Sequence, residues 1–457
     1  MSKFLGDDYL IDNASAASLY PGVSGLPLVD PHNHADVREI SENGHYTDIW
    51  QAECATDHYV WELLRKRGIA EDYITGNRSN DEKWQSAAAV WDDFAGNPTY
   101  EWVHLDLQRR FAIGDLINAG TAADIWHRTG EALQRDEMKP RALLRTMNVE
   151  VMCSTDDPID TLEHHKNLAG VLDHTVVKPT FRPDRAVNIF KKDWRGYIAD
   201  LETRVNGTFK NIGDVIAALR TTHDHFAEHG CLASDHGVEI PYAYAVDEAD
   251  ADTAFRAAYD RKKLEQHQEI AYMSYIFNEV AAMDCEKDWV LQIHIGAVRD
   301  VRTALFDDIG PDAGGDVSSQ SIDIVKPLQD LLNRFDDKLK IIFYCVDPTH
   351  QPTITTLARA YGAKTNVGPA WWWNDAPHGM ARQLEYIAEA DLLANFPGMV
   401  SDSRKLLSYG SRHEMFRRVL CSVVGRMVEA GRVPMAVAEN LVQRIVYDNP
   451  KRFFGFG

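Results

Sequence analysis

Two histidines separated by one residue follow a short apolar run near the start of the chain. The run LPLVD (26–30) leads into His32 and His34. In an extended backbone, residues i and i+2 point the same way, so the two imidazoles can reach one divalent cation. A pair of unrelated surface histidines is the alternative. Their place at the end of an apolar run, beside Asp30, favours a metal site.

A carboxylate and a guanidinium have the same spacing near the end of the chain. The run GMVSD (398–402) ends in Asp402, and Arg404 follows two residues later. Both side chains then point to one side of an extended backbone. Asp402 would bind a metal or take a proton from a substrate, and Arg404 would bind an anion or stabilise developing negative charge. A simple ion pair at a strand end is the alternative.

Two apolar runs in the middle of the chain also end in ionisable groups. His294 ends the run WVLQIH (289–294), and Asp235 ends CLASD (231–235), with His236 next to it. Each motif alone fits a structural residue whose hydrogen bonds are satisfied within the fold. Because several such runs end in ionisable groups, we expect their ends to meet in one active site.

Short apolar runs that alternate with longer helical stretches predict the elements that position these groups. Such runs are typical of a parallel sheet with helices on both faces. Eight of them with intervening helices predict an α/β fold of the TIM-barrel type, a (β/α)8 barrel, in which reactive side chains gather at the carboxyl ends of the strands. The predicted strands are residues 26–30, 149–154, 171–177, 231–235, 289–294, 340–345, 363–368 and 398–402.

The connection between the first two predicted strands is too long for a simple loop. Segments within it, such as DEKWQSAAAVWDDFAG and PTYEWVHLDLQRRFAI, are strongly helical in composition. We expect residues 60–140 to form a helical insertion over the mouth of a single barrel that spans residues 1–457.

The composition is that of a globular protein with an acidic surface. Of 457 residues, 45% are hydrophobic and 26% charged, and 48 basic against 69 acidic side chains give a net charge of −21. Such a surface repels nucleic acid and anionic lipid. No run suits a membrane helix, the first residues lack a secretion pattern, and the six cysteines form no Cys-x-x-Cys pair. We therefore expect a cytoplasmic protein with neither nucleic-acid nor membrane partners.

The HxH motif, His294 on the fifth predicted strand and Asp402 on the eighth resemble the amidohydrolase superfamily of metal-dependent barrels. Further segments, from about residue 4 to the end, narrow the resemblance to the uronate isomerases, also called glucuronate isomerases. Their ordered combination, above all WWWND followed by SDSR, is specific. The segments are FLGDDYLIDNASAASLYP, PLVDPHNH, ATDHYVWELLRKRGI, STDDP, PTFRPD, LQIHIGAVRD, PAWWWND and SDSRKLLSYGSRHEMFRRVLC.

The resemblance implies an enzyme that interconverts an aldose and a ketose, D-glucuronate with D-fructuronate and D-galacturonate with D-tagaturonate. A proton moves from C2 to C1 through a cis-enediol. Asp402 would be the base, with Tyr59 of the DHY motif or His32 as its partner, and Arg404 would bind and polarise the substrate near the reacting carbon.

The resemblance also implies a metal site and a sugar pocket. A divalent metal, usually zinc, would be held by His32, His34, His294 and Asp402. Arg182 in FRPD would grip the substrate carboxylate, although Arg185 is close enough to do so instead. The remaining pocket residues would be His58, Asp235, Trp371, Trp372 and Trp373.

Two other functions are compatible with the same residues. A metal-dependent hydrolase of the superfamily would use a metal-bound hydroxide, but Asp235 and His236 stand where two-metal hydrolases have a bridging lysine, and His350 comes late after the sixth strand. A sugar-acid binding protein without catalysis is the second alternative. The preferred uronate, the metal among Zn²⁺, Mn²⁺ and Fe²⁺, and assembly into a homo-oligomer are left open.

Overall fold

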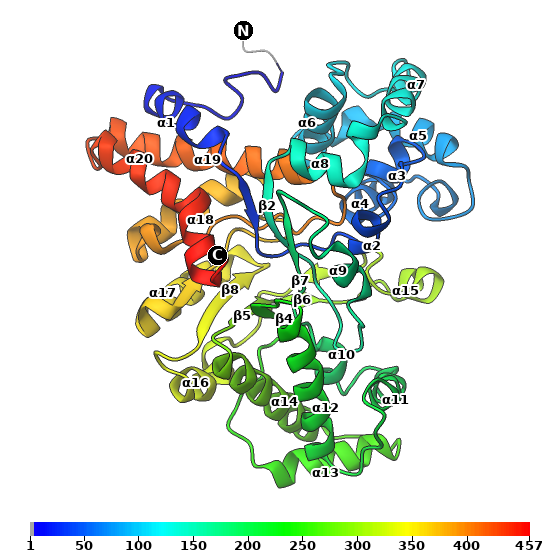
Figure 1. Ribbon diagram of the computed structural model, residues 1–457, viewed down its shortest axis with the longest axis vertical. Helices are drawn as coiled ribbons and strands as arrows, with labels where there is room; N and C mark the ends of the chain where they lie inside the picture. The colour runs from blue at the N-terminus through cyan, green and yellow to red at the C-terminus, as the bar shows by residue number, and fades with distance from the viewer. Residues whose placement is uncertain (1–3) are drawn as a thin grey trace.

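The computed structural model describes residues 4–457 as an α/β molecule with its strands at the centre (Figure 1). Two parallel sheets have the strand orders β1-β2-β3 and β4-β5-β8-β9, and β6 and β7 form an antiparallel pair. The strands are β1 Leu28–Asp30, β2 Val149–Cys153, β3 Val176–Lys178, β4 Ala233–Val238, β5 Val290–Ile295, β6 Ala297–Val298, β7 Val317–Ser318, β8 Lys340–Cys345 and β9 Thr365–Val367.

Helices occupy most of the connections between strands. Around β1 and β2 these are α1 Ala14–Ser24, α2 Val37–Glu42, α3 Ile49–Glu53, α4 His58–Lys66, α5 Asn80–Ala88, α6 Pro98–Phe111, α7 Ala122–Leu133 and α8 Pro140–Thr146. From β2 to β5 they are α9 Glu163–Leu168, α10 Asp184–Val187, α11 Trp194–Arg204, α12 Ile212–Glu228, α13 Glu248–Tyr259 and α14 Gln266–Glu286. The rest are α15 Thr303–Ile309, α16 Val325–Arg334, α17 Gln351–Tyr361, α18 Pro377–Ala390, α19 Ser408–Glu429, α20 Met435–Gln443 and α21 Asn449–Phe454.

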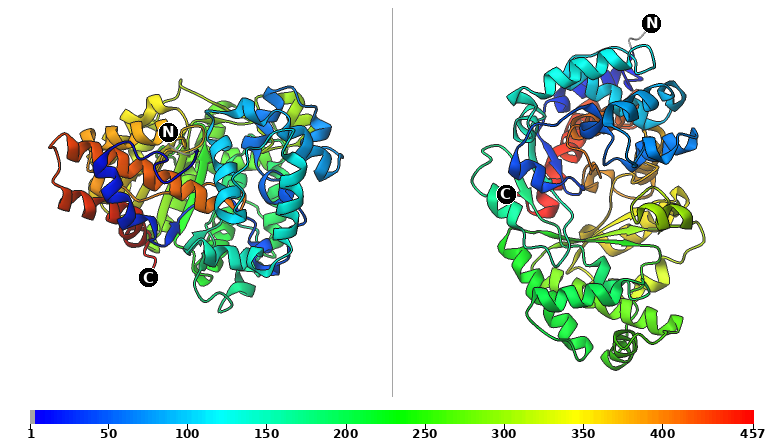
Figure 2. Two further views of the ribbon diagram at one scale, coloured as in Figure 1. Left: turned by 90° about the horizontal axis from the view of Figure 1, so that it is seen from above. Right: turned by 90° about the vertical axis from the view of Figure 1, so that its right-hand side faces the viewer.

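The helices surround the strands on opposite sides. In Figure 1, α2 to α8 gather at the upper right, α1 with α18 to α20 at the upper left, and α11 to α14 below. The N-terminal helix α1 packs along α19 from the other end of the chain, as both figures of the ribbon show (Figures 1 and 2). Every residue of β5 is buried, which explains why its residues other than Gln292 and His294 are apolar.

The two parallel sheets meet at Phe181. This residue forms isolated parallel bridges with Asp156, which follows β2, and with Ser234 in β4. The carboxyl ends of β1 to β5 therefore lie along one edge, where a parallel arrangement brings together the side chains that follow the strands.

The predicted strand at residues 398–402 is wrong, since the structure has no regular strand there. Gly398 and Asp402 have φ angles of 91° and 50°, and left-handed residues interrupt an extended run. The segment still runs beside the residues that follow β1, because the Asp402 N–H donates to the His32 carbonyl at 3.2 Å. The third strand begins later than predicted, at Val176, because turns occupy the residues before it.

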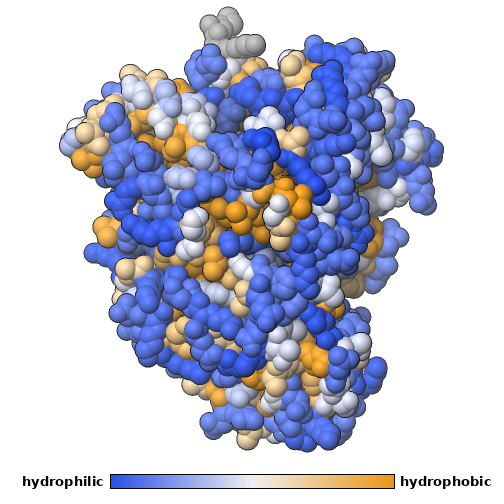
Figure 3. Space-filling model, viewed as in Figure 1, coloured by the Kyte–Doolittle hydropathy of each residue, from blue (hydrophilic) through white to orange (hydrophobic). Residues whose placement is uncertain are grey.

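The visible surface is mostly polar. The face in Figure 3 is largely hydrophilic, with apolar atoms gathered near the middle, where the strands lie in Figure 1. Within residues 4–457, no helix is both long and apolar enough to cross a membrane.

Candidate active site

Most of the predicted site residues surround one cavity of about 320 Å³. They come from the segment after β1, the start of α4, the segment after β3, the end of β5, the loop after β9 and the segment before α19. Residues that lie more than 300 positions apart in the chain are brought together in this way. The predicted residues that line the cavity are His32, His34, His58, Arg182, His294, Trp371, Trp372, Asp402 and Arg404.

The HxH motif and Asp402 meet in the cavity. Asp402 Oδ1 lies 3.1 Å from His32 Nε2 and 3.2 Å from His34 Nε2. Burial alone would raise the pKa of the Asp402 carboxyl, but the hydrogen bonds from the two histidines hold it well below its usual range. On its other side, Asp402 Oδ2 accepts a hydrogen bond of 2.8 Å from the Trp371 indole. The carboxylate is thus oriented from both sides.

A second group of metal-binding side chains adjoins the first. Ligand atoms of His32, Asp235 and His294 lie within 4.8 Å of one another. The His294 Nδ1–H donates to Asp235 Oδ1 at 2.7 Å, and the ring stacks on Tyr344 with centroids 4.1 Å apart. Nδ1 is therefore the protonated nitrogen, and the lone pair is on Nε2.

The His294 imidazole fits a metal ligand on two grounds. Its Nε2 is buried and has no hydrogen-bond partner among the described residues. Burial lowers the pKa of His294 to about 4, although Asp235 opposes the shift. The neutral imidazole is the form that binds a metal. Together with the carboxylate of Asp402, this set of donors suits a divalent cation.

Arg182 reaches the cavity, whereas Arg185 does not line it. The Arg182 guanidinium makes ion pairs of 2.9 Å with Asp235 and 2.8 Å with Asp184. Arg185 is 49% exposed and pairs with Asp157 at 3.8 Å. Asp235 is fully buried behind the cavity wall, so it acts on the cavity through Arg182 and His294.

Gly237 makes room for the Arg182 guanidinium. A Cβ atom at this position would overlap Arg182 Nη2. We expect Gly237→Ala to displace the guanidinium, to lower kcat/KM about 10-fold, and to lower the melting temperature because the ion pair with buried Asp235 is weakened. Gly196→Ala is the control, because nothing lies within 4 Å of its Cβ. Equal kinetics for the two variants would mean that the Arg182 position does not matter.

His58 and Tyr59 begin α4 and point to different partners. The Asp57 side chain caps the helix by accepting a 3.0 Å hydrogen bond from the Tyr59 N–H. The His58 ring stacks on Trp372 in the cavity wall, with centroids 5.2 Å apart. Tyr59 is buried and does not line the cavity. Its hydroxyl group donates a hydrogen bond of 2.9 Å to Asp375.

Five charged residues that the sequence did not indicate also line the cavity: Asp184, Lys191, Arg299, Asp300 and Asp312. Asp312 Oδ1 lies 3.3 Å from Arg404 Nη2 and 3.7 Å from Arg299 Nη1. Arg299 follows shortly after His294 in LQIHIGAVRD, which was the available signal for it. Asp312 and Lys191 lie in loops with no spacing that relates them to a strand end, so no signal pointed to them.

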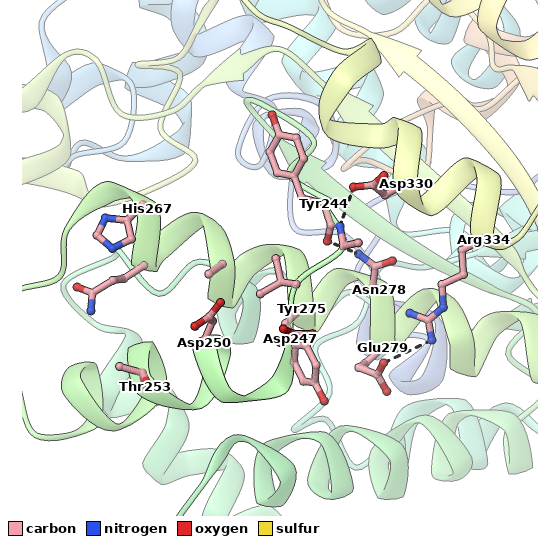
Figure 4. A pocket seen from close by; sticks show the side chains of 14 residues that line it. Tyr244, Asp247, Asp250, Thr253, His267, Tyr275, Asn278, Glu279, Asp330 and Arg334 are labelled. Carbon is pink, nitrogen blue, oxygen red and sulfur yellow. Dashed lines mark hydrogen bonds and ion pairs between the residues drawn. The ribbon is translucent and has the colours of Figure 1, made fainter.

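A larger cavity of about 590 Å³ lies elsewhere, among α13, α14 and α16 (Figure 4). It is lined by several carboxylates, and one of them, Glu279, pairs with Arg334 at 3.6 Å. Among residues 4–457, the clusters with metal-ligand spacing belong to the smaller cavity instead. Chemistry rather than volume therefore identifies the candidate active site.

Comparisons with known proteins show which family the chain resembles. The family model described as glucuronate isomerase matches residues 1–454. A uronate isomerase of Thermotoga petrophila is 50% identical over 451 residues, which cover 99% of each chain.

Solved structures give the same result. The uronate isomerase of Thermotoga maritima has a TM-score of 0.97 and 49% identity over 99% of this chain and 100% of that one. A glucuronate isomerase from Caulobacter crescentus has a TM-score of 0.94 and 26% identity, with coverage of 98% and 96%. By its family model and its relatives, the chain belongs to the glucuronate (uronate) isomerase family.

Proposed function

We propose that the protein isomerises D-glucuronate to D-fructuronate and D-galacturonate to D-tagaturonate at the smaller cavity. The observation that carries this proposal is the Asp402 carboxylate, held between two imidazoles and an indole and facing a cavity rich in arginine. A uronate isomerase needs one base that serves two adjacent carbons and basic groups for an anionic sugar. The cavity offers both.

Asp402 takes the proton from C2 of the open-chain sugar and returns it to C1. Arg404 lies in the same cavity and stabilises the negative charge that develops on the substrate oxygens. Tyr59 or His32 is the partner of Asp402, and His32 is already within 3.1 Å of its carboxylate. The proposed reaction balances without an external oxidant: one proton moves from C2 to C1, the O2 hydroxyl proton is transferred to O1 through the partner group, and C2 is oxidised as C1 is reduced.

His32, His34, His294 and Asp402 would hold the divalent ion, with Zn²⁺ proposed because imidazole and carboxylate ligands suit it. The unpartnered Nε2 of His294 supports this assignment. When bound, the ion supplies Lewis acidity toward a substrate oxygen. Metal analysis of the purified protein should find a bound divalent ion that is lost in His34→Ala. Equal metal content in that variant would remove His34 from the ligand set.

Arg182 would bind the substrate carboxylate, and aromatic rings would form the sugar-binding wall. Arg182 lines the cavity, which Arg185 does not. Trp371 and Trp372 lie in the same wall, and flat rings suit the apolar face of a sugar. His58 extends this wall by stacking on Trp372.

Asp312 reduces the positive charge that the cavity offers to an anion. It pairs with Arg404 and lies within 3.7 Å of Arg299. We expect Asp312→Asn to lower the KM for a uronate about 3- to 10-fold, because the substrate no longer competes with a resident carboxylate. Asp308→Asn, at the end of α15, is the control. An unchanged or higher KM in Asp312→Asn would show that Asp312 helps rather than opposes binding.

We also propose that the α/β fold is a single closed (β/α)8 barrel of residues 1–457, with residues 60–140 as a helical insertion. Support for closure comes from the bridges at Phe181 and from the backbone hydrogen bond between Asp402 and His32. We also propose that the protein works in the cytoplasm on small uronates, without nucleic-acid or membrane partners, and that it can form a homo-oligomer.

Proton NMR of the purified protein with each aldose tests the function. The matching ketose should appear until equilibrium is reached, and the two initial rates rank D-glucuronate against D-galacturonate. A folded, metal-loaded protein that changes neither aldose would refute the proposal. The hydrolase alternative is not favoured. His350, the candidate for a second metal site, forms a 3.2 Å hydrogen bond with the Ser319 carbonyl instead.

A further inference from the structure

One short segment contacts both proposed proton-transfer groups. The loop between β9 and α18 contains Trp371, whose indole donates to Asp402, and Asp375, whose Oδ2 accepts the Tyr59 hydroxyl proton at 2.9 Å. Trp371 lines the cavity, whereas Asp375 lies behind it. The segment therefore sets the orientation of Asp402 from inside the cavity and that of Tyr59 from outside.

Asp375 is itself held by a buried arginine. Arg412 in α19 is 2% exposed, and its Nη1 lies 3.1 Å from the same Asp375 oxygen that binds Tyr59. The Arg412 guanidinium also lies 3.7 Å from the ring centroid of Trp102, and Nη1 donates to the Ser401 carbonyl at 3.2 Å. Contacts on both sides fix the guanidinium, so Asp375 has a rigid counter-ion.

A buried ion pair of this kind needs a reason other than stability. Removing two charges from water costs about as much as their attraction returns, so an apolar pair of similar volume would stabilise the fold equally well. The second Asp375 oxygen, Oδ1, is buried and has no hydrogen-bond partner among the described residues. The other oxygen, Oδ2, is the one that accepts the hydrogen bond from the Tyr59 hydroxyl group.

We propose that Asp375, anchored by Arg412, is a positioning residue that holds the Tyr59 phenol for proton transfer. The phenol has one proton, and the hydrogen bond directs it toward Asp375. The Tyr59 oxygen then offers its lone pairs toward the site, and a proton that it accepts there is balanced by the transfer of its own hydroxyl proton to the Asp375 carboxylate. This inference rests on the proposed function, since it gives Tyr59 a part in the isomerisation.

The arrangement has a consequence that a structural role would not have. If Asp375 acts through Tyr59, its loss matters only while the phenol is present. We expect Asp375→Asn to lower kcat about 10- to 100-fold with KM within about twofold of wild type. In a Tyr59→Phe background, the same substitution should change kcat by less than about twofold, because coupled residues are not additive.

Glu53→Gln is the matched control. Glu53 is a buried carboxylate of the same region and pairs with Lys405 at 2.9 Å, with no hydrogen bond to Tyr59 in the described structure. Its substitution also removes one buried negative charge, but its effect on kcat should be the same with and without the Tyr59 hydroxyl. Asp375→Glu should restore part of the activity, since it returns a carboxylate.

Asp375→Asn alone leaves Arg412 buried without its counter-ion, which could prevent folding. The double variant Asp375→Asn with Arg412→Met is the test in that case. It removes both charges, so it should fold and still show the low kcat. Additive effects of Asp375→Asn and Tyr59→Phe, or wild-type kcat in the double variant, would overturn the inference. Failure of the proposed function would appear separately, as an absence of ketose with the wild-type protein.

Discussion

Asp402→Asn is expected to lower kcat by about 1,000-fold or more while the protein still binds a uronate. The amide has nearly the same volume and can still accept the Trp371 hydrogen bond, but it cannot take a proton from C2. A positioned general base contributes about 10²- to 10⁴-fold to a rate. Turnover is measured by NMR and binding by calorimetry, each on protein whose metal content has been determined.

Asp157→Asn is the control for this substitution. Asp157 also follows a strand of the parallel sheet, but it pairs with Arg185 and does not line the cavity. We expect its kcat to stay within about threefold of wild type, because the amide can still accept the 2.8 Å hydrogen bond from Tyr197 and the side chain lies outside the cavity. Wild-type turnover in Asp402→Asn would refute its assignment as the base. If both turnover and binding were unchanged in Asp402→Asn, the protein would still be an enzyme, so the binding-protein alternative would have no support either.

Arg182→Met is expected to remove activity and to lower the free energy of unfolding by about 3–5 kcal/mol. Asp235 is fully buried, and the loss of its 2.9 Å partner leaves an uncompensated charge inside the protein. His294 then loses the fixed carboxylate that orients its ring, and the cavity loses the group that we propose for the substrate carboxylate. Urea unfolding gives the stability, and initial rates with both aldoses give the activity.

Arg185→Met separates the two arginines of the FRPDR segment. Arg185 is half-exposed and its ion pair is long, so we expect a change of less than about 1 kcal/mol in stability and wild-type kinetics. Arg182→Lys adds a second comparison, because it keeps the charge but loses the planar fork and should raise KM. A raised KM in Arg185→Met with wild-type kinetics in Arg182→Met would reverse the assignment.

The sequence by itself determined the features that depend on short-range spacing. The alternation of His32 and His34 and the apolar runs of β5 and β8 follow from the two-residue period of an extended chain and from burial on both faces. These rules act within a few residues, so no tertiary information was needed. The same reasoning failed at residues 398–402, where a left-handed Asp402 breaks the regular strand.

Only the tertiary structure decided which partner each of the longer side chains has. Arg182 rather than Arg185 lines the cavity, and the Tyr59 hydroxyl binds Asp375, which is 316 residues away in the chain. Likewise, Asp312 from a distant loop forms an ion pair with Arg404. Spacing along the chain does not encode such pairings, because the direction of a flexible side chain depends on the charges and surfaces that packing brings next to it.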